Sequence, residues 1–269
     1  MLYNFSVLIS VYSKENPLFF DLALDSIYRQ TFLPNEIIVV QDGKLTQQLY
    51  DIINKWKTLL PIKDVILQEN QGLGIALNRG LNACTNDLVM RVDSDDINHT
   101  DRFEKQYNYM NKNLDITMCG SHIAEFDNEP TNIIGFRFVP IGKEISSVIN
   151  KRNPFNHMTV CFRKKHILAV GGYQDLKFME DYYLWIRLYA QGYKLENINE
   201  ILVDARTGIK MIKRRKGILY LKSEIIMFQY LLKFKIGKNF STISIFTLRA
   251  IFRLMPSYLL SKFYMILRK

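Results

Sequence analysis

The chain has 269 residues, of which 48% are hydrophobic, with 36 Lys and Arg, 26 Asp and Glu, and three Cys. This length allows one large domain or one domain plus an appendage, and the composition excludes a disordered, collagen-like or disulfide-stapled protein. The cysteines (Cys84, Cys119 and Cys161) lie far apart without metal-ligand spacing, which predicts a reducing compartment.

Charge divides the chain into two unequal parts. Residues 1–204 carry 21 basic and 25 acidic side chains, whereas residues 205–269 carry 15 basic side chains and a single acid, Glu224. We therefore predict an enzyme-like domain over residues 1–206 and a basic, apolar, helical extension over residues 207–269.

We predict that the extension lies on a membrane surface and does not cross the bilayer. Lys222, Glu224, Arg249 and Arg253 interrupt its apolar runs before they reach the roughly 20 residues of a transmembrane helix. A cationic amphipathic helix binds an anionic lipid surface, where each Lys or Arg contributes about 1 kcal/mol. The alternative is that these helices pack on the domain with a solvated basic face. We expect no nucleic-acid partner, because no nucleic-acid-binding module accompanies the basic run 213–216.

The N-terminal part of the chain alternates strand-like and helix-like segments. The apolar run 5–11 predicts a strand and not a signal peptide, since it lacks a basic leader and a small-residue cleavage site. The segments that follow are predicted as helix 17–30, strand 36–41, helix 47–60, strand 64–68, helix 74–83 and strand 87–92. This order predicts an α/β fold with a doubly wound, mostly parallel sheet flanked by helices.

The pattern is more mixed beyond residue 111. Short strands are predicted at 116–119, 133–139 and 159–163, and a helix at 180–191. Open parallel sheets bind ligands outside the carboxyl ends of their strands. Polar segments 10–12, 41–43 and 93–96 each follow an apolar strand, so we expect them to gather along one edge of the sheet.

The densest cluster of carboxylates is the run Asp93-Ser94-Asp95-Asp96. Three like charges repel one another, and a divalent cation among them would relieve the repulsion. Mg²⁺ and Mn²⁺ prefer oxygen ligands, and Mg²⁺ is typically held by one or two carboxylates plus substrate phosphates. The alternative is an acidic turn in which Asp96 caps a helix near Arg102.

Four segments in this order resemble glycosyltransferase family 2, the inverting nucleotide-sugar transferases with a GT-A fold. They are residues 6–17, 26–43, 69–97 and 171–188, and together they extend the resemblance over about residues 5–204. Within the family, the chain is most similar to the bacterial group that builds O-antigen, capsule and exopolysaccharide repeat units, including amylovoran-type transferases.

The resemblance implies two groups of nucleotide-binding residues. Val11, Tyr12, Glu15 and Asp42 would hold the nucleobase, and a carboxylate facing uracil N3–H would favour a uridine nucleotide. Arg79 would reach the nucleotide or its diphosphate. From the residues alone, Asp42 also fits a turn dipeptide with Gly43, and Arg79 also fits a surface position.

For the chemistry, the resemblance implies that Asp93 contacts the ribose or donor sugar and that Asp95 ligates Mn²⁺ or Mg²⁺ with help from Asp96. The cation would neutralise the departing diphosphate. Asp181 would be the general base, with Glu180 as the second choice. The pair also fits acids that are favoured at a helix N-terminus by the helix dipole.

Two aromatic side chains have competing interpretations. His157 would touch the donor phosphate or the acceptor, although a lone histidine is more often structural. Trp185 follows the acidic pair, and we predict that it belongs to the core and is not a platform for a sugar.

The function implied is transfer of one sugar from a UDP-sugar to a lipid-pyrophosphate-linked sugar in bacterial surface polysaccharide biosynthesis. The enzyme would be cytoplasmic and peripherally attached to the inner face of the cytoplasmic membrane. The Gln-x-x-Arg-Trp signature of processive synthases is absent, which favours a single transfer. Two alternatives are a nucleotidyltransferase acting on sugar phosphates, which usually has a Gly-rich loop where residues 12–17 have none, and a non-catalytic membrane- or nucleic-acid-binding module.

Overall fold

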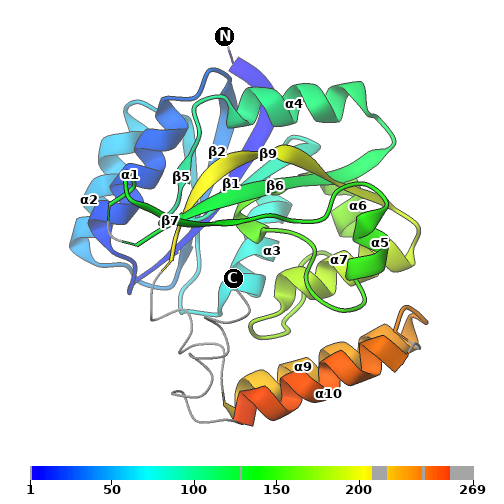
Figure 1. The fold of residues 1–269 in the computed structure, drawn as a ribbon. Coiled ribbons are helices and arrows are strands. Elements are labelled where there is room, and N and C mark those ends of the chain that lie inside the picture. Colours follow the sequence, from blue (N-terminus) through cyan, green and yellow to red (C-terminus); the bar gives the residue numbers. More distant parts are fainter. Residues whose placement is uncertain (1, 128, 208–216, 238–239, 255–269) are drawn as a thin grey trace.

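The computed structural model describes residues 2–127, 129–207, 217–237 and 240–254 (Figure 1). Within these ranges nine strands form one sheet: β1 (Leu2–Tyr12), β2 (Leu33–Asp42), β3 (Ile62–Ile66), β4 (Leu88–Val92), β5 (Ile97–Asn98), β6 (Ile116–Phe126), β7 (Ile133–Arg137), β8 (Cys161–Arg163) and β9 (Lys194–Arg206). Their order is β3-β2-β1-β4-β8-β6-β9-β5, and β7 pairs with β6.

The first four strands are parallel, as the alternating pattern predicts. β1 pairs in parallel with both β2 and β4, and β2 pairs in parallel with β3. The second part of the sheet is mixed: β8 runs antiparallel to β4 and β6, whereas β9 runs parallel to β6. The mostly parallel doubly wound sheet is therefore confirmed, with an antiparallel strand at its centre.

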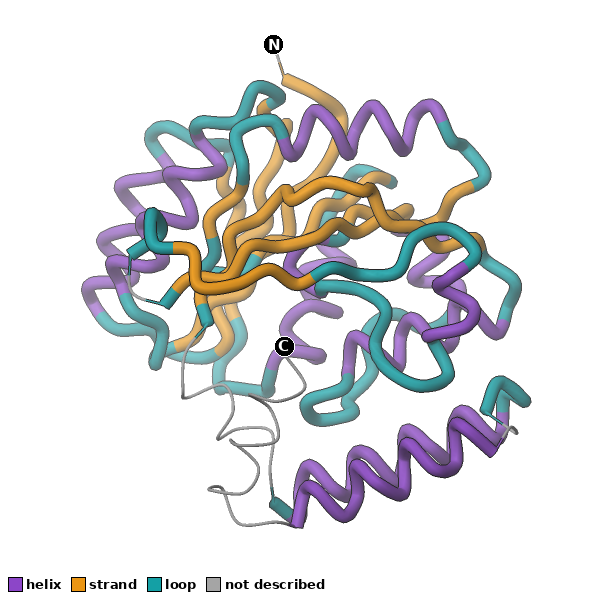
Figure 2. Tube along the Cα trace, in the orientation of Figure 1, coloured by secondary structure: helices purple, strands orange, loops and turns teal. Residues whose placement is uncertain are grey.

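Helices cover both faces of the sheet (Figure 2). One face packs against α1 (Pro17–Tyr28), α2 (Gln47–Lys57) and α4 (Arg102–Lys112). The other face packs against α3 (Leu73–Ala83), α6 (Lys164–Ala169) and α7 (Glu180–Ala190). Two short helices, α5 (Glu144–Val148) and η1 (His157–Thr159), lie in the connections between β7 and β8.

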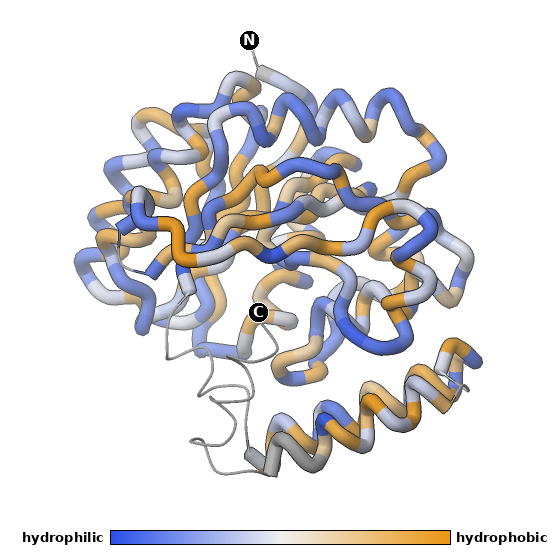
Figure 3. The backbone as a smooth tube through the Cα atoms, in the orientation of Figure 1, coloured by the Kyte–Doolittle hydropathy of each residue, from blue (hydrophilic) through white to orange (hydrophobic). Residues whose placement is uncertain are grey.

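The central strands are apolar on both sides because both of their faces are covered. In β1, Val7, Ile9 and Val11 join the core beneath α1, α2 and α4, whereas Leu8 joins the core beneath α3 and α7. In Figure 3, hydrophobic segments occur both in the strands and along the helices that cover them. Side-chain alternation along one strand thus supplies two separate cores.

Local signals fix where the first helices begin. The Asn16 side chain accepts a hydrogen bond from the Leu18 backbone N–H, and Pro17 occupies the first turn of α1, where no N–H is needed. Thr46 caps α2 in the same way through the Leu49 N–H. Both helices start where the predicted ones do.

Several strands differ from the prediction: β5 was not predicted, and β6 extends to Phe126 where the prediction ended at residue 119. β3 covers Ile62–Ile66, two residues earlier than predicted, and its outward residues are exposed because it is the edge of the sheet. β9 was not predicted at all. Its pairing with β6 shifts register near Ser121 and His122, and such irregularities break the two-residue alternation that marks a strand.

The C-terminal part of the described chain is a pair of helices, α9 (Ile218–Lys233) and α10 (Phe240–Leu254), which lie side by side below α7 in Figure 1. Met227 and Leu231 of α9 and Phe246 of α10 are buried in the core cluster that contains α7. Every helix within the described ranges is too short or too polar to cross a bilayer. Residues 208–216 and 255–269 of the predicted extension lie outside the described residues.

Candidate active site

The predicted polar segments meet at the carboxyl edge of the parallel strands. Tyr12 and Asp42, the last residues of β1 and β2, are direct partners in the strand register. The Ser94 hydroxyl donates a 2.5 Å hydrogen bond to a carboxylate oxygen of Glu15, which joins the loop after β4 to the loop after β1. The edge of the sheet therefore brings together residues from three loops.

Asp42 holds the loop that leads into α3. Its buried carboxylate accepts hydrogen bonds from the backbone N–H groups of Gln71 (2.7 Å) and Gly72 (3.1 Å) and from the Asn70 side chain (3.0 Å). Three bonds leave about one of the four lone-pair sites of a carboxylate for a ligand. Gly43 is required beside it, since φ is +83° and an added Cβ would lie 2.7 Å from the Asn70 nitrogen.

The three aspartates after β4 form a compact oxygen cluster. One carboxylate oxygen each from Asp93, Asp95 and Asp96 lies within 4.8 Å of the others. Burial, together with the charges of Asp93 and Glu15, raises the pKa of Asp95 to about 7. Burial and its two acidic neighbours also raise the pKa of Asp96, whose Oδ2 is buried without a hydrogen-bond partner among the described residues. A hard divalent cation fits this donor set, because it would neutralise the repulsion and use the orphaned oxygen.

Arg206, at the end of β9, holds this cluster through one carboxylate and one backbone carbonyl. Its N–H donates to Asp96 Oδ1 (2.7 Å), and its Nε donates to the Asp95 carbonyl (3.2 Å). The guanidinium carbon lies 3.6 Å from the ring centroid of Phe19 and 4.5 Å from that of Phe126. Stacking on two rings holds the Arg206 guanidinium in place. The loop of acids after β4 is therefore anchored to the end of β9.

Arg91 of β4 is a buried cation that acts electrostatically on both groups of acids. Its Nη2 donates to Asp93, and its Nε and Nη1 are buried without hydrogen-bond partners among the described residues. Burial raises the pKa of Asp95, Asp96, Glu180 and Asp181. The charge of Arg91 lowers the pKa of all four. The sequence analysis missed Arg91, although a charged residue inside the otherwise apolar strand 87–92 was a visible signal.

The acidic pair begins α7, as expected for acids at a helix N-terminus. Burial raises the pKa of Asp181, while hydrogen bonds from the Tyr182 N–H and the Asn153 side chain, both 2.7 Å, lower it. Burial and the Asp181 charge raise the pKa of Glu180 to about 7. Asn153 is a second residue that the sequence analysis passed over.

His157 is held within the protein. Its Nε2 is 2.9 Å from the Tyr173 hydroxyl, and its ring meets Trp185 edge-on with centroids 6.0 Å apart. Burial and the nearby Arg91 charge lower its pKa well below the usual value, so the ring is neutral. Trp185 is fully buried, which confirms its prediction as a core residue.

Two predicted nucleotide-binding residues have contrasting surroundings. The Val11 side chain is fully buried in the core beneath α1 and α2, so only its backbone is available to a ligand. Arg79 lies exposed in the second turn of α3.

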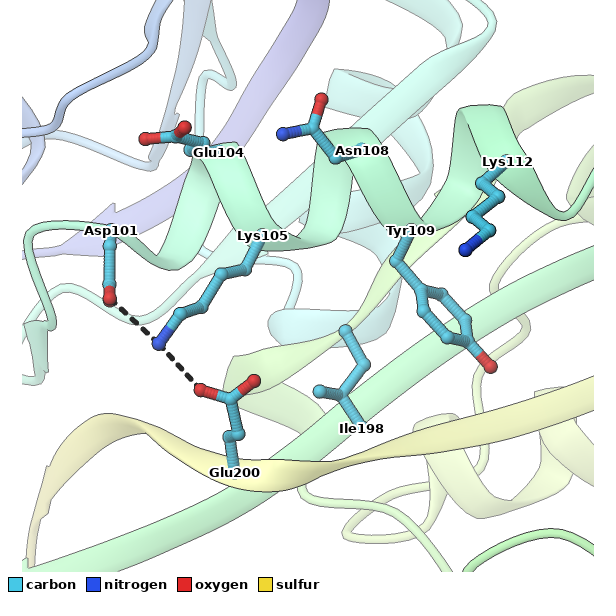
Figure 4. Close-up of a pocket in the computed structure, with 8 residues that line it drawn as sticks. All are labelled: Asp101, Glu104, Lys105, Asn108, Tyr109, Lys112, Ile198 and Glu200. Atoms are coloured by element: carbon cyan, nitrogen blue, oxygen red, sulfur yellow. Dashed lines mark hydrogen bonds and ion pairs between the residues drawn. The ribbon is translucent and has the colours of Figure 1, made fainter.

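A surface hollow of about 480 Å³ lies elsewhere, between α4 and β9 (Figure 4). Lys105 crosses its floor and pairs with Asp101 (2.7 Å) and Glu200 (2.5 Å). None of the acids discussed above lines it, and its central lysine is already paired with two acids.

Comparison with known proteins assigns the fold and the chemistry. The model of the family "Glycosyl transferase family 2" matches residues 6–171. The chain belongs to this family. The resemblance inferred from the sequence is thereby confirmed, and the protein is a glycosyltransferase.

Curated relatives support this assignment over most of the chain. The chain is 46% identical over 222 residues to the Escherichia coli UDP-Gal:alpha-D-GlcNAc-diphosphoundecaprenol beta-1,3-galactosyltransferase, covering 82% of this chain and 81% of that enzyme. It is 38% identical over 253 residues to the amylovoran biosynthesis glycosyltransferase AmsE of Erwinia amylovora, covering 94% of both.

Solved structures confirm the GT-A fold of this glycosyltransferase. S. aureus TarS 1-349 superposes with a TM-score of 0.68 at 18% identity, covering 92% of this chain and 71% of that one. The mannosyltransferase PcManGT of Pyrobaculum calidifontis, in complex with GDP-Man and Mn²⁺, gives a TM-score of 0.66 at 14% identity, covering 99% and 81%. At these identities the likeness concerns the fold alone.

Proposed function

We propose that this glycosyltransferase moves one hexosyl residue, with inversion, from a UDP-sugar to a sugar on a lipid diphosphate. The support is the 46% identical relative, whose name gives UDP-galactose as donor and a GlcNAc-diphosphoundecaprenol as acceptor. UDP-galactose is therefore the first donor to test, and bacterial surface polysaccharide is the product class.

In this proposal the nucleotide lies over the ends of β1 and β2. Tyr12 is partly exposed there beside the Asp42 carboxylate, which has about one acceptor site left for uracil N3–H. The Val11 backbone and Glu15 complete the base and ribose side. Arg79 is the cation available to the diphosphate from α3.

A divalent cation, Mn²⁺ or Mg²⁺, would be held by Asp95 with Asp93 and Asp96, and when bound it would stabilise the charge of the departing diphosphate. The residues of the chain perform the other tasks. Arg91 donates a hydrogen bond to the Asp93 carboxylate, and Arg206 donates to the Asp96 carboxylate and to the Asp95 backbone carbonyl.

The acceptor is activated from the other side. Asp181 accepts the proton of the acceptor hydroxyl while that oxygen forms a bond to the sugar C1 and the bond from C1 to the UDP oxygen breaks. Asn153 orients the Asp181 carboxylate through its 2.7 Å hydrogen bond. Glu180 is the second candidate for this role. The observation that carries the proposal is the cluster of Asp93, Asp95 and Asp96, in which one carboxylate oxygen of each lies within 4.8 Å of the others and the Oδ2 of Asp96 is orphaned among the described residues.

The test is a screen of UDP-sugars with a synthetic GlcNAc-diphosphate-lipid acceptor, with Mn²⁺ or with a chelator. We expect one UDP-hexose to be transferred, transfer to stop with chelator, and the new linkage to have the inverted anomeric configuration. Retention of configuration would contradict the proposal. Transfer of a nucleotidyl group from a nucleoside triphosphate to a sugar phosphate would also contradict it.

We also propose that α9 and α10 lie on the anionic inner face of the cytoplasmic membrane. The outward face of α9 alternates exposed apolar and basic residues at helical spacing, namely Leu219, Lys222, Ile225, Ile226, Leu232 and Lys233. Residues 205–269 contain 15 basic residues and one acid, which complements a negative lipid surface.

Co-sedimentation of the full chain with vesicles tests this attachment. Binding is expected on phosphatidylglycerol vesicles, weaker binding on phosphatidylcholine vesicles, and loss of binding in the double variant Ile225→Glu/Ile226→Glu. Ile66→Glu, on the exposed edge strand β3, is the matched control. Equal binding of the double variant and the control would show that α9 is not the contact.

A further inference from the structure

We propose that α9 does more than attach the enzyme to lipid: its aromatic side chains hold the segment that carries Asp181 in its working position. The inference rests on the proposed role of Asp181 as base. It assigns Tyr220 and Tyr230 as positioning residues that act through Phe178 and Tyr183.

The first contact lies immediately before the acidic pair. Phe178 has a positive φ of 70°, which is uncommon and strained for a bulky residue. Its ring stacks on Tyr220 of α9, with centroids 5.3 Å apart and planes 19° apart. A strained residue persists only when its surroundings hold it, and α9 supplies that support two residues before Glu180.

The second contact lies within α7. The Tyr183 and Tyr230 rings stack with centroids 4.2 Å apart, and the Arg187 guanidinium carbon is 4.5 Å from the Tyr183 centroid. Arg187 donates hydrogen bonds to the carbonyls of Val170 and Gly172. A continuous series of contacts therefore joins α9 to the start of the segment between α6 and α7.

The inward face of α9 packs against the domain. Met227 and Leu231 are fully buried, and Glu224 is 2% exposed and pairs with Arg249 of α10 at 3.3 Å. Glu224 and Arg249 both act electrostatically on Tyr182, whose hydroxyl donates a 2.5 Å bond to the Ile149 carbonyl. Tyr182, which directly follows Asp181, belongs to the same core cluster as Met227 and Leu231.

The donor side of the site is built on other elements. Asp42 ends β2, and Asp93 and Asp95 follow β4, whereas α9 packs against α7 and the segment before it. Weakening the α9 contact should therefore misplace the base without displacing the nucleotide. A misplacement of about 1 Å is sufficient to lower turnover by up to about 100-fold.

The experiment compares Tyr220→Ala, Tyr220→Phe and Phe178→Asn in the full chain. Asn accepts a positive φ, so Phe178→Asn removes the ring while keeping the backbone conformation. Turnover is measured with a short-chain, water-soluble sugar-diphosphate acceptor, which makes attachment to lipid irrelevant. UDP–Mn²⁺ affinity and thermal unfolding are measured on the same samples. The matched control is Tyr28→Ala, which removes an aromatic contact to Trp56 on the opposite face of the sheet.

We expect kcat to fall about 10-fold or more in Tyr220→Ala and Phe178→Asn, with UDP–Mn²⁺ affinity within about twofold of the parent. Tyr220→Phe, which keeps the ring, should recover most of the turnover, and Tyr28→Ala should retain it. Parental kcat in folded Phe178→Asn would overturn the inference. Asp181→Asn, assayed in parallel, separates the two claims: if it transfers normally, the assignment of the base is wrong.

Discussion

At the scale of single residues, the site contains like charges that lie close together. Asp93, Asp95 and Asp96 follow β4, Glu180 and Asp181 begin α7, and burial raises the pKa of Asp95, Asp96 and both members of the pair. Arg91 is the shared counter-charge. The reaction needs the base ionised, so the hydrogen bonds that lower its pKa determine the pH at which the enzyme works.

Replacing Asn153 by Ala should shift the pH dependence of kcat. The Asn153 side chain donates to Asp181 and lowers its pKa. Without this bond the pKa rises further, and the base becomes protonated at a higher pH. The acid limb of the kcat–pH profile should therefore move to higher pH, while kcat at high pH changes less. An unchanged limb would mean that another group is titrating.

Replacing Arg91 by Met should destabilise the fold, because Asp93 loses its buried partner. The expected cost is about 2–3 kcal/mol, less than for a fully buried pair, because 29% of the Asp93 side chain is exposed to water. Arg91→Lys keeps the charge and should cost less. Urea unfolding measures both, and exposed Arg79→Met is a control that should stay within about 0.5 kcal/mol of the parent. Equal stability of Arg91→Met and the control would show that the pair does not stabilise the fold.

At the scale of elements, apolar runs and caps predicted the parallel half of the sheet. Asn16 and Thr46 begin α1 and α2, and the runs 5–11 and 36–41 form β1 and β2. β9 was not predictable in this way, because bulges in its pairing with β6 break the alternation. The same limit hid Arg206, whose contacts depend on where the end of β9 lies.

Gly43 gives a test at this scale. Gly43→Ala meets both a positive φ of 83° and a backbone atom 2.7 Å from the new Cβ, whereas Gly192→Ala meets a similar φ of 78° with open space around it. The control should cost about 1 kcal/mol, and Gly43→Ala clearly more. Thermal unfolding distinguishes them, and equal losses would mean that the Asp42–Asn70 loop adapts without strain.

At the scale of the whole molecule, the sequence predicted the groups of site residues better than their connections. Chain order placed Tyr12, Asp42 and Asp93 at one sheet edge, since parallel strands end together. The contacts of Arg91 and Asn153, and of Phe178 with α9, join residues far apart in sequence, and no local pattern encodes them. The charge imbalance predicted a basic extension, and the described helices α9 and α10 contribute Met227, Leu231 and Phe246 to the core cluster that contains α7.

The most direct measurement compares Asp181→Asn with Asp95→Asn for transfer and for calorimetric UDP–Mn²⁺ binding. Removing only the base should lower kcat by about 10²–10⁴ while UDP–Mn²⁺ binds as in the parent. Asp95→Asn should lose both, because it removes a ligand of the cation. Normal transfer by Asp181→Asn, or loss of its nucleotide binding, would contradict the account of a base that faces a cation-bound diphosphate.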